Sequence, residues 1–254
     1  GWERPNYFAT VGFDDLTSRS FRRGAWWNFV KEEAISVRKT AGLIDATAFT
    51  KHVIKGPGAT AFLDWFTCNK LPKVGRINLT YALTEKGTTR TEYTIVRVKH
   101  DEYYLVSAGA WQAYDADFLI KAIQDKEMEF GRIELQDVTS QFGVFAIAGP
   151  NSRAILSDLV RHPEPETVFS NKNFPWLSAK SIELGMCPVN AIRVAYTGEL
   201  GWELHHPIEI QNYLFDQLEN SGQKHGMKLV GARAQNWLRQ ELSLIHISEP
   251  TRRR

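Results

Sequence analysis

The sequence predicts an α+β fold. Predicted strands recur in hairpin pairs, predicted helices stand between these pairs, and one strand–turn–helix unit occurs twice. Strands joined by hairpins are typical of antiparallel or mixed sheets and argue against a doubly wound parallel sheet. The chain has 254 residues, of which 43% are apolar and 24% charged, so it can bury the core of one large domain or of two smaller ones.

Local patterns define the elements of the first half. Residues 1–23 contain scattered aromatic residues without helical or strand periodicity, which predicts an irregular segment held on the surface. Apolar residues from Trp26 to Lys39 recur at helical spacing, and Gly42 is the predicted stop of that helix. Strands are further predicted at 48–55, 79–83, 93–98 and 103–106, and helices at 59–66 and 112–124.

The second half repeats one unit of the first. A predicted strand at 144–148 ends at Gly149-Pro150 and precedes a helix at 152–160, just as the strand before Gly56-Pro57 precedes its helix. Glycine ends the strand and proline near the first helical turn starts the helix. The offset of 93 residues is too long for a solenoid, so the pattern predicts a duplicated β-α-β subdomain. A hairpin of 191–196 and 202–205 and helices at 208–221 and 232–240 follow.

Charge and cysteine content exclude several classes of protein. Lys and Arg exceed Asp and Glu by two, and this surplus lies within the last thirteen residues, so the rest of the chain is neutral and carries no nucleic-acid footprint. Cys68 and Cys187 form no CxxC motif, which argues against a thiolate zinc site and a disulfide framework. No leader or membrane span is encoded, so we expect a soluble protein of the bacterial cytoplasm or the mitochondrial matrix.

Several catalytic and binding motifs are absent from the sequence. It contains no GxSxG elbow, no GxxxxGK[ST] loop and no GxGxxG after a strand, which removes the anchors of a hydrolase triad, a P-loop and a dinucleotide site. His205 and His206 are neighbours on a predicted strand and point to opposite faces, so a shared metal ion is not expected. We therefore predict no metal site.

A carboxylate in a predicted strand is the first candidate for chemistry. Alternation places Glu92 on one face with Thr94, Val96 and Val98, and Tyr93 with Ile95 on the other. An acid beside valines needs a partner or access to water. Glu92 is therefore either a strand-end residue that reaches water or a carboxylate that lines a pocket.

Three further polar residues are candidates for ligand binding. Tyr196 and Glu203 flank the turn of the second predicted hairpin and can converge at its mouth. A carboxylate there can accept two parallel N–H bonds from a 2-amino-4-oxo heterocycle such as a pterin or guanine. Arg239, late in its helix, can hold an anionic group. The alternatives are an exposed hairpin with satisfied polar groups and a solvated arginine favoured by the helix dipole.

The segment Tyr196–Leu204, with the sequence YTGELGWEL, resembles a signature of the folate-binding domains of dimethylglycine and sarcosine dehydrogenases. The wider family is that of the glycine-cleavage aminomethyltransferase, or T-protein. Further segments that fit the resemblance lie at 1–8, 20–23, 72–75, 83–87, 147–150 and 238–241. The resemblance covers about residues 1–241 and implies a folate-binding aminomethyltransferase-type fold with a duplicated α+β subdomain, the family's C-terminal barrel being missing here.

The resemblance also implies roles for the candidate residues. Tyr196 and Glu203 would contact the pterin, and Arg239 would lie near the aminobenzoyl-glutamate end of tetrahydrofolate. Glu92 stands where T-proteins usually have an aspartate that positions and activates the folate, so it is the expected catalytic residue. Its side chain is one methylene longer than that of the aspartate.

Three parts of the chain are expected. Residues 1–24 would be a linker that follows an absent flavin domain, and residues 25–241 an incomplete folate-binding aminomethyltransferase-like domain. Residues 242–254 resemble the translation of a sequencing adapter, which predicts a non-native tail and a natural protein cut off at about Glu241.

The function implied is that of the tetrahydrofolate-binding part of an FAD-dependent N-methyl amine dehydrogenase. The flavin domain of the same parent chain would oxidise the amine, and the present domain would hold the tetrahydrofolate that captures the one-carbon unit. Two alternatives remain open at this point: a stand-alone folate-dependent aminomethyl- or methyltransferase, and a non-catalytic folate-binding relative.

Overall fold

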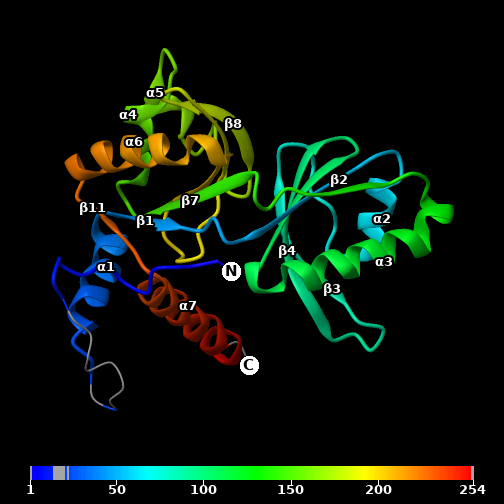
Figure 1. The fold of residues 1–254 in the computed structure, drawn as a ribbon, viewed down its shortest axis with the longest axis horizontal. Coiled ribbons are helices and arrows are strands. Elements are labelled where there is room, and N and C mark those ends of the chain that lie inside the picture. Colours follow the sequence, from blue (N-terminus) through cyan, green and yellow to red (C-terminus); the bar gives the residue numbers. More distant parts are fainter. Residues whose placement is uncertain (1, 14–20, 22, 253–254) are drawn as a thin grey trace.

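The computed structural model describes residues 2–13, 21 and 23–252, and for residues 243–252 it describes the backbone alone. The described chain forms two lobes side by side (Figure 1). Lobe A is built on a six-stranded sheet and lobe B on a five-stranded sheet. Both sheets combine with helices, so the predicted α+β class is confirmed.

Lobe B is a five-stranded antiparallel sheet with helices on one face. The strand order is β3 (Ile77–Leu83), β4 (Thr89–Lys99), β5 (Glu102–Ser107), β2 (Thr50–Lys55) and β6 (Glu134–Asp137). The covering helices are α2 (Ala59–Phe66) and α3 (Gln112–Phe130), the latter preceded by the short turn η1 (Gly109–Trp111). Their core with the sheet includes Phe62, Tyr93, Ile95, Leu105 and Leu119, all fully buried.

Lobe A is a six-stranded sheet with helices on both faces. The strand order is β11 (Met227–Leu229), β1 (Ala41–Asp45), β7 (Phe142–Ala148), β10 (Gly201–Pro207), β9 (Cys187–Ile192) and β8 (Ala179–Leu184), and only the β1–β11 pair among them is parallel. The outer face carries α4 (Ser152–Leu159), α5 (Pro165–Val168), η2 (Ile208–Ile210) and α6 (Gln211–Lys224). Trp202, Leu204 and Ile147 face the core beneath these helices.

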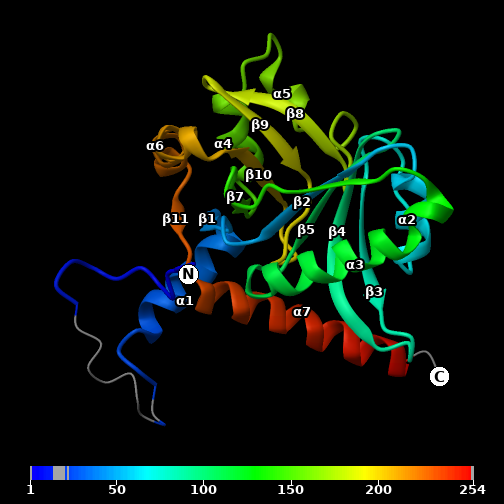
Figure 2. The same ribbon diagram turned by 45° about the vertical axis from the view of Figure 1, so that its right-hand side comes forward.

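The other face of the lobe A sheet contacts two helices. These are α1 (Trp27–Lys39) and α7 (Ala232–Arg252), whose residues Val37 and Leu238 pack with Ile44 of β1. Figures 1 and 2 show α7 leaving this lobe and running below both lobes. The helix therefore forms a floor under the junction between them.

The two lobes share one connectivity. In both, a central strand ends directly before Gly56 or Gly149, and a helix begins three residues later. Both glycines have positive φ angles, 120° and 129°, which other residues rarely adopt. Three strands follow each helix, and in each lobe they pair in the same order outward from the central strand, β2 or β7. The predicted duplication is confirmed.

Register makes this correspondence residue-specific. Val53 of β2 lies opposite Tyr104 of β5, and Ala146, which is 93 residues after Val53, lies opposite Glu203 of β10. Tyr104 and Glu203 therefore occupy equivalent positions in the two lobes.

Several predicted element boundaries need correction. Gly42 does not stop α1, which ends at Lys39, but lies within β1, where a Cβ would come within 2.6 Å of both Val37 and Val230. The predicted strand at 191–196 is wrong at both ends, because β9 begins at Cys187 and ends at Ile192, and Tyr196 lies in the loop before β10. Helix α7 continues past Glu241, and the origin of residues 242–254 stays a prediction. Four short strands without strong alternation, β1, β6, β8 and β11, were not predicted.

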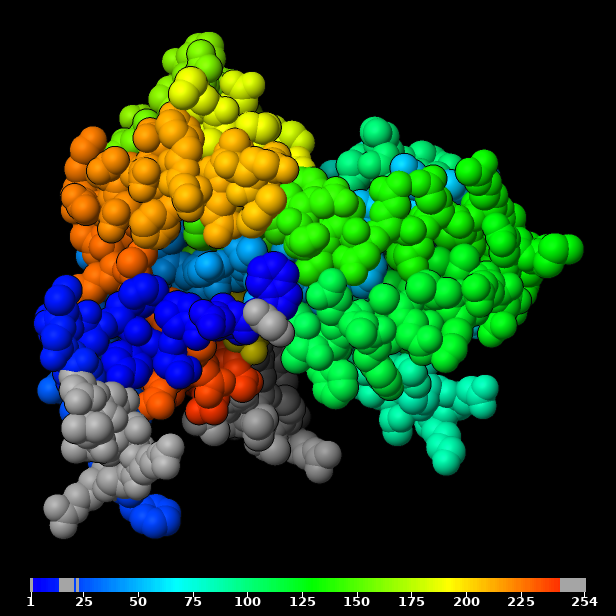
Figure 3. Space-filling model, viewed as in Figure 1, coloured from blue at the N-terminus to red at the C-terminus, as the bar shows by residue number. Residues whose placement is uncertain are grey.

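The N-terminal segment crosses the start of α7 (Figure 3). The backbone N–H groups of Ala232 and Arg233 donate to the carbonyls of Pro5 and Asn6 at 2.9 and 3.0 Å. The buried Glu33 carboxylate accepts from the N–H groups of Phe8 and Gly231 at 2.6 and 3.0 Å. Described residues 2–13 thus form the predicted irregular surface segment, whereas residues 14–20 and 22 lie outside the described part of the chain.

Candidate functional site

The sheets of the two lobes face each other through one side of each. On β10, Trp202 and Leu204 enter the core of lobe A, so Glu203 and His205 lie on the opposite face. On β4, Tyr93 and Ile95 enter the core of lobe B, so the face of Glu92 and Val96 is the other one, as predicted. Val96 packs in one cluster with Ile192 of β9 and Ile77, which shows that these two faces meet.

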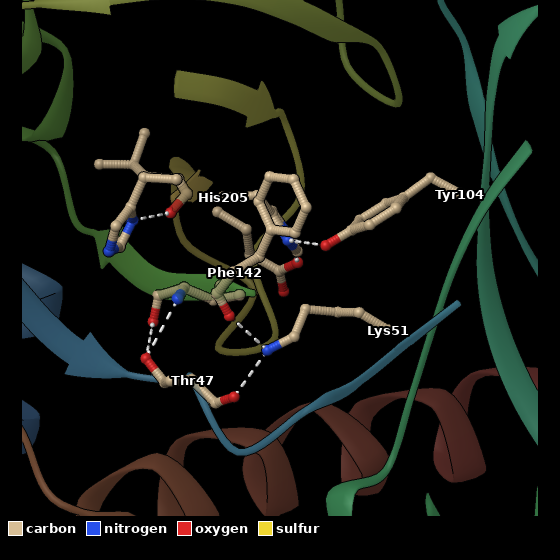
Figure 4. A network of polar contacts seen from close by, with 9 residues as sticks. Thr47, Lys51, Tyr104, Phe142 and His205 are labelled. Atoms are coloured by element: carbon tan, nitrogen blue, oxygen red, sulfur yellow. Dashed lines mark hydrogen bonds and ion pairs between the residues drawn. The ribbon is translucent and has the colours of Figure 1, made fainter. Parts of the chain in front are cut away.

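A polar network crosses the junction of the lobes (Figure 4). The hydroxyl of Tyr104, on β5, lies 3.0 Å from Nδ1 of His205, and Nε2 of His205 lies 3.4 Å from Oε2 of Glu203. His205 is 1% exposed, and the side chain of Glu203 is 13% exposed. The network therefore ends at a carboxylate that is partly accessible from outside.

A buried lysine joins the lobes beside this network. The Nζ atom of Lys51, on β2, donates to the carbonyl oxygens of Thr47 and Phe142, both at 2.7 Å. Burial lowers the pKa of Lys51 from 10.5 to about 8, so the amine is mostly charged at neutral pH. Its two carbonyl acceptors, one of which belongs to β7, hold the segment between β1 and β2 against lobe A.

The phenol of Tyr104 stays protonated in this environment. Burial, and secondly the negative charge of Glu203, raise the pKa of Tyr104 well above its usual value of 10. Tyr104 is therefore a hydroxyl at any physiological pH and has a proton to donate.

A second polar region lies at the start of α7. A cavity of about 400 Å³ is lined by residues from the N-terminal segment, from the β9–β10 loop and from α7, namely Arg4, Asn6, Tyr196, Ala232, Arg233, Gln235, Asn236 and Arg239. None of these described lining residues is acidic, and three are arginines. Such a cavity attracts an anion.

The arginines of this cavity are held in place by neighbours. Arg4 donates from Nη2 to Oε1 of Gln235 at 2.7 Å. Arg239 donates from Nε to Oδ1 of Asn236 at 2.8 Å, and its guanidinium carbon lies 6.0 Å from the centre of the Tyr196 ring. The side chains therefore present their charge in a restricted geometry.

The four predicted site residues occupy three places. Tyr196, which is 55% exposed, and Arg239 come together in the arginine-lined cavity. Glu203 belongs to the inner face of lobe A and to the network with His205. Glu92 is exposed on the inner face of lobe B, four residues or about 13 Å along β4 from Val96. The structure thus unites Tyr196 with Arg239, and puts Glu92 and Glu203 on facing sheets.

Four residues of these regions, Lys51, Tyr104, Arg4 and Arg233, were not singled out from the sequence, and His205 was considered there only as a metal ligand. For His205 a signal existed, because it lies two residues after Glu203 on the same face of a strand. Lys51 gave no such signal, because β2 also contains the basic residues His52 and Lys55 and the pattern does not show that Lys51 is buried. No local pattern identifies Tyr104 or Arg4, because their roles depend on how distant segments pack.

Two further properties concern the described residues alone. Within them, no group of three or more His, Cys, Asp and Glu side chains is arranged to hold a metal ion. No helix in this part of the chain has the length and apolar character needed to cross a membrane.

Comparison with known proteins identifies the family. The sequence matches the family described as "GCVT N-terminal domain" over residues 1–254. Mitochondrial dimethylglycine dehydrogenase of Rattus norvegicus is 35% identical over 242 residues, which cover 95% of this chain and 27% of that protein. A protein of Thermococcus gammatolerans described as "Probable aminomethyltransferase" is 28% identical, over 85% of this chain and 57% of its own length.

Solved structures agree on the fold. The glycine cleavage system aminomethyltransferase T from Bartonella henselae superposes with a TM-score of 0.69 at 21% identity, over 92% of this chain and 58% of that one. The present chain spans about a quarter of the length of the dimethylglycine dehydrogenases that it matches. It belongs to the GCVT N-terminal domain family and is an aminomethyltransferase-type domain related to dimethylglycine and sarcosine dehydrogenases.

Proposed function

We propose, from the membership of this chain in the GCVT N-terminal domain family, that it is the tetrahydrofolate-binding part of a flavin-dependent N-methyl amine dehydrogenase of the dimethylglycine or sarcosine type. The 35% identity to dimethylglycine dehydrogenase over nearly the whole chain supports this choice of parent enzyme. The observation that carries the binding role is the Glu203 carboxylate, which lies partly exposed between two facing sheets.

Glu203 fits the polar edge of a pterin. Its Oε2 atom faces His205, and among the described residues Oε1 has no hydrogen-bond partner. A carboxylate with acceptor capacity on both oxygens can receive the two parallel N–H groups of a 2-amino-4-oxo heterocycle. The low exposure of this carboxylate strengthens such bonds relative to bonds made in water.

The arginine-lined cavity fits the other end of tetrahydrofolate. The aminobenzoyl-glutamate end carries carboxylates, and Arg4 and Arg233 supply positive charge without a competing acid among the lining residues described, with Arg239 lining the same cavity. Tyr196 adds an exposed aromatic ring beside Arg239. Arg4 and Arg233 therefore join Tyr196 and Arg239 as proposed binding residues.

Glu92 is the proposed catalytic residue. It is exposed on the face of lobe B that meets lobe A. Among the described residues, no hydrogen bond or ion pair occupies its carboxylate. A carboxylate there would orient the amines of the bound folate or take a proton from them.

Most of the rate enhancement would come from positioning. Tetrahydrofolate, when bound, supplies the two amines N5 and N10 that take up the one-carbon unit. The residues of this chain would hold these amines in place and exclude water, which replaces a bimolecular encounter and prevents loss of formaldehyde. Oxidation of the amine would occur on FAD, in a flavin domain of the same parent chain.

Titration of the chain with tetrahydrofolate by calorimetry tests the proposal. Loss of a charged acceptor that receives two hydrogen bonds should weaken binding at least about tenfold in Glu203→Ala. Glu209→Ala, which removes an exposed acid six residues further along, is the matched control and should bind like the wild type. Equal affinities of Glu203→Ala and the wild type would remove Glu203 from the site.

A stand-alone aminomethyltransferase is the second candidate. The match to the Thermococcus protein, which extends over 57% of that shorter relative, favours it. The reading frame that encodes this chain distinguishes the two, because a flavin domain with a GxGxxG motif before Gly1 is expected only for the dehydrogenase. Full one-carbon transfer by Glu92→Gln would instead fit a relative in which this acid has no catalytic role.

A further inference from the structure

We infer that Tyr104 and His205 are positioning residues for Glu203, and that a directed chain of hydrogen bonds runs from the Tyr104 hydroxyl through the His205 ring to the Glu203 carboxylate. The chain starts in lobe B and ends in lobe A, so it makes the orientation of Glu203 depend on the docking of the two lobes. The inference rests on the proposed role of Glu203 in binding.

The direction of the chain follows from what each group can donate. An ionised carboxylate only accepts, so Nε2 of His205, 3.4 Å from Oε2 of Glu203, must carry the proton. In a neutral imidazole Nδ1 is then an acceptor. The Tyr104 hydroxyl, 3.0 Å from Nδ1, must therefore donate.

The hydrogen-bonding requirement of the Tyr104 hydroxyl indicates that the imidazole ring of His205 is neutral. An imidazolium would donate from Nδ1 to the Tyr104 oxygen and leave the tyrosine proton without an acceptor, because His205 is the one hydrogen-bond partner of this hydroxyl among the described residues. With a neutral His205 ring, Nδ1 accepts from the Tyr104 hydroxyl and Nε2–H donates to Glu203, so both hydrogen bonds form.

Packing of aromatic rings fixes the orientation of the His205 side chain relative to Tyr104 and Glu203. The Tyr104 and His205 rings stand nearly perpendicular, at 87°, with centres 5.4 Å apart. Phe142 contacts Tyr104 from a third side, with ring centres 6.2 Å apart. His205 is 1% exposed, so no water competes freely for its nitrogens. The Nε2–H group thus stays directed at one lone pair of Oε2 of Glu203, and Oε1 together with the second lone pair of Oε2 remains available to a ligand.

Nitrogen NMR of the chain labelled with ¹⁵N-histidine tests the direction without any ligand. We expect the signals of His205, assigned by their loss in His205→Gln, to show the neutral Nε2–H tautomer at pH 7.5. In Tyr104→Phe the donor at Nδ1 is gone and this tautomer preference should weaken. A wild-type His205 that is protonated at Nδ1 would overturn the inference.

A double-mutant cycle tests whether Tyr104 acts through Glu203. Tyr104→Phe should raise the Kd for tetrahydrofolate about fivefold, an effect of the size expected for one lost hydrogen bond. In a Glu203→Gln background the same change should have no further effect, because the group that Tyr104 positions is already altered. Equal losses in both backgrounds would contradict the inference.

Tyr103→Phe is the matched control for this cycle. Tyr103 is the neighbour on β5, points into the core of lobe B and contacts Thr60 through its hydroxyl at 2.9 Å. Its variant should bind tetrahydrofolate with wild-type affinity. His205→Gln is the conservative rescue, because a glutamine amide can also donate to Glu203 and accept from Tyr104, and its affinity should exceed that of His205→Leu.

The two hypotheses fail in different ways. If wild-type chain binds no tetrahydrofolate but His205 has the Nε2–H tautomer and Tyr104→Phe shifts it, the proposed function fails and the hydrogen-bond chain stands. If Glu203→Ala loses tetrahydrofolate binding and Tyr104→Phe binds like the wild type, the function stands and the positioning role is refuted.

Discussion

Lobes A and B carry different chemistry at equivalent positions. Glu203 in lobe A and Tyr104 in lobe B have the same register relative to their central strands, and both lie on the inner face of their sheet. Beside them, His205 stands opposite Val144 in lobe A, whereas Val106 stands opposite Lys51 in lobe B. In each of these equivalent pairs, His205 with Val106 and Lys51 with Val144, one lobe has the polar residue and the other an apolar one.

This difference distinguishes the duplicated sheets, which form a frame shared by both lobes, from the polar residues that only one lobe has. Duplication supplies two similar sheets whose inner faces meet at Val96 and Ile192, themselves equivalent residues that pack together. The polar substitutions that break the equivalence then supply the network of Lys51, Tyr104, His205 and Glu203. Equivalent substitutions in the shared frame should therefore lower the free energy of unfolding by similar amounts, whichever lobe carries them. Substitutions of the unequal residues should have effects that the equivalent substitution in the other lobe does not have.

The shared turns should give the largest effect. At Gly149 a Cβ would lie 2.6 Å from the carbonyl oxygens of Val37 and Thr40, and at Gly56 it would lie 2.7 Å from that of Arg132. Both positions also have φ angles that alanine rarely adopts. We expect Gly56→Ala and Gly149→Ala each to lower the free energy of unfolding by about 4 kcal/mol in urea titrations.

Gly87→Ala is the control for these two variants. Gly87 also has a positive φ, 75°, but nothing lies within 4 Å of its Cβ position. Its variant should lose only about 1 kcal/mol. If one of the two turn glycines were as tolerant as Gly87, the two turns would not be equivalent parts of the frame.

Substitution of Lys51 should give the next largest loss of stability, and the equivalent residue of lobe A, Val144, has no comparable role. Lys51→Met leaves the carbonyls of Thr47 and Phe142 without their donor, and we expect a loss of about 2 kcal/mol in the free energy of unfolding at pH 7. Val144→Met, at the equivalent position in lobe A, removes no side-chain hydrogen bond. Any loss in its free energy of unfolding therefore measures only the cost of packing a methionine at that position.

The pH dependence of this difference identifies the lysine as its source. The pKa of Lys51 is about 8 in the folded chain, against 10.5 as its usual value. Between these values the unfolded chain binds more protons than the folded one, so this residue makes stability rise with pH. The stability difference between wild type and Lys51→Met should therefore widen from pH 8 to 10.5. A constant or narrowing difference would contradict the burial of a charged amine.

The smallest effect is expected at the cavities. The arginine-lined cavity at α7 has no acidic lining residue among those described, whereas the cavity between α2, α3 and the β3–β4 hairpin combines Lys86, Arg90 and Lys121 with Glu85 and Asp125. Arg4→Ala should raise the Kd for tetrahydrofolate about threefold at low salt, and less at high salt. Lys86→Ala should leave it unchanged, and an equal loss in both variants would indicate a nonspecific charge effect.

Sequence patterns were informative where structure is local. The Gly-Pro turns, the helix at 59–66 and the alternation around Tyr93 needed only neighbouring residues, and the structure confirms all three. Gly42 was misread as a helix stop because the need for glycine there depends on the packing of β1 against a distant residue, Val230, as well as on the nearby Val37.

The candidate site was predictable only in part for the same reason. The motif around Glu203 identified one lobe's contribution from the sequence. Tyr104 lies 99 residues before Glu203, and Arg4 reaches its cavity only because the N-terminal segment crosses α7. Such pairings depend on how the lobes dock, which no local period encodes.

The most direct test of the central claim is a crystal structure of the chain with bound tetrahydrofolate. We expect the pterin between the facing sheets, with its 2-amino group and adjacent ring N–H on the Glu203 carboxylate and its glutamate end toward Arg239. A pterin bound in the cavity between α2, α3 and the β3–β4 hairpin, or one that makes no contact with Glu203, would contradict it.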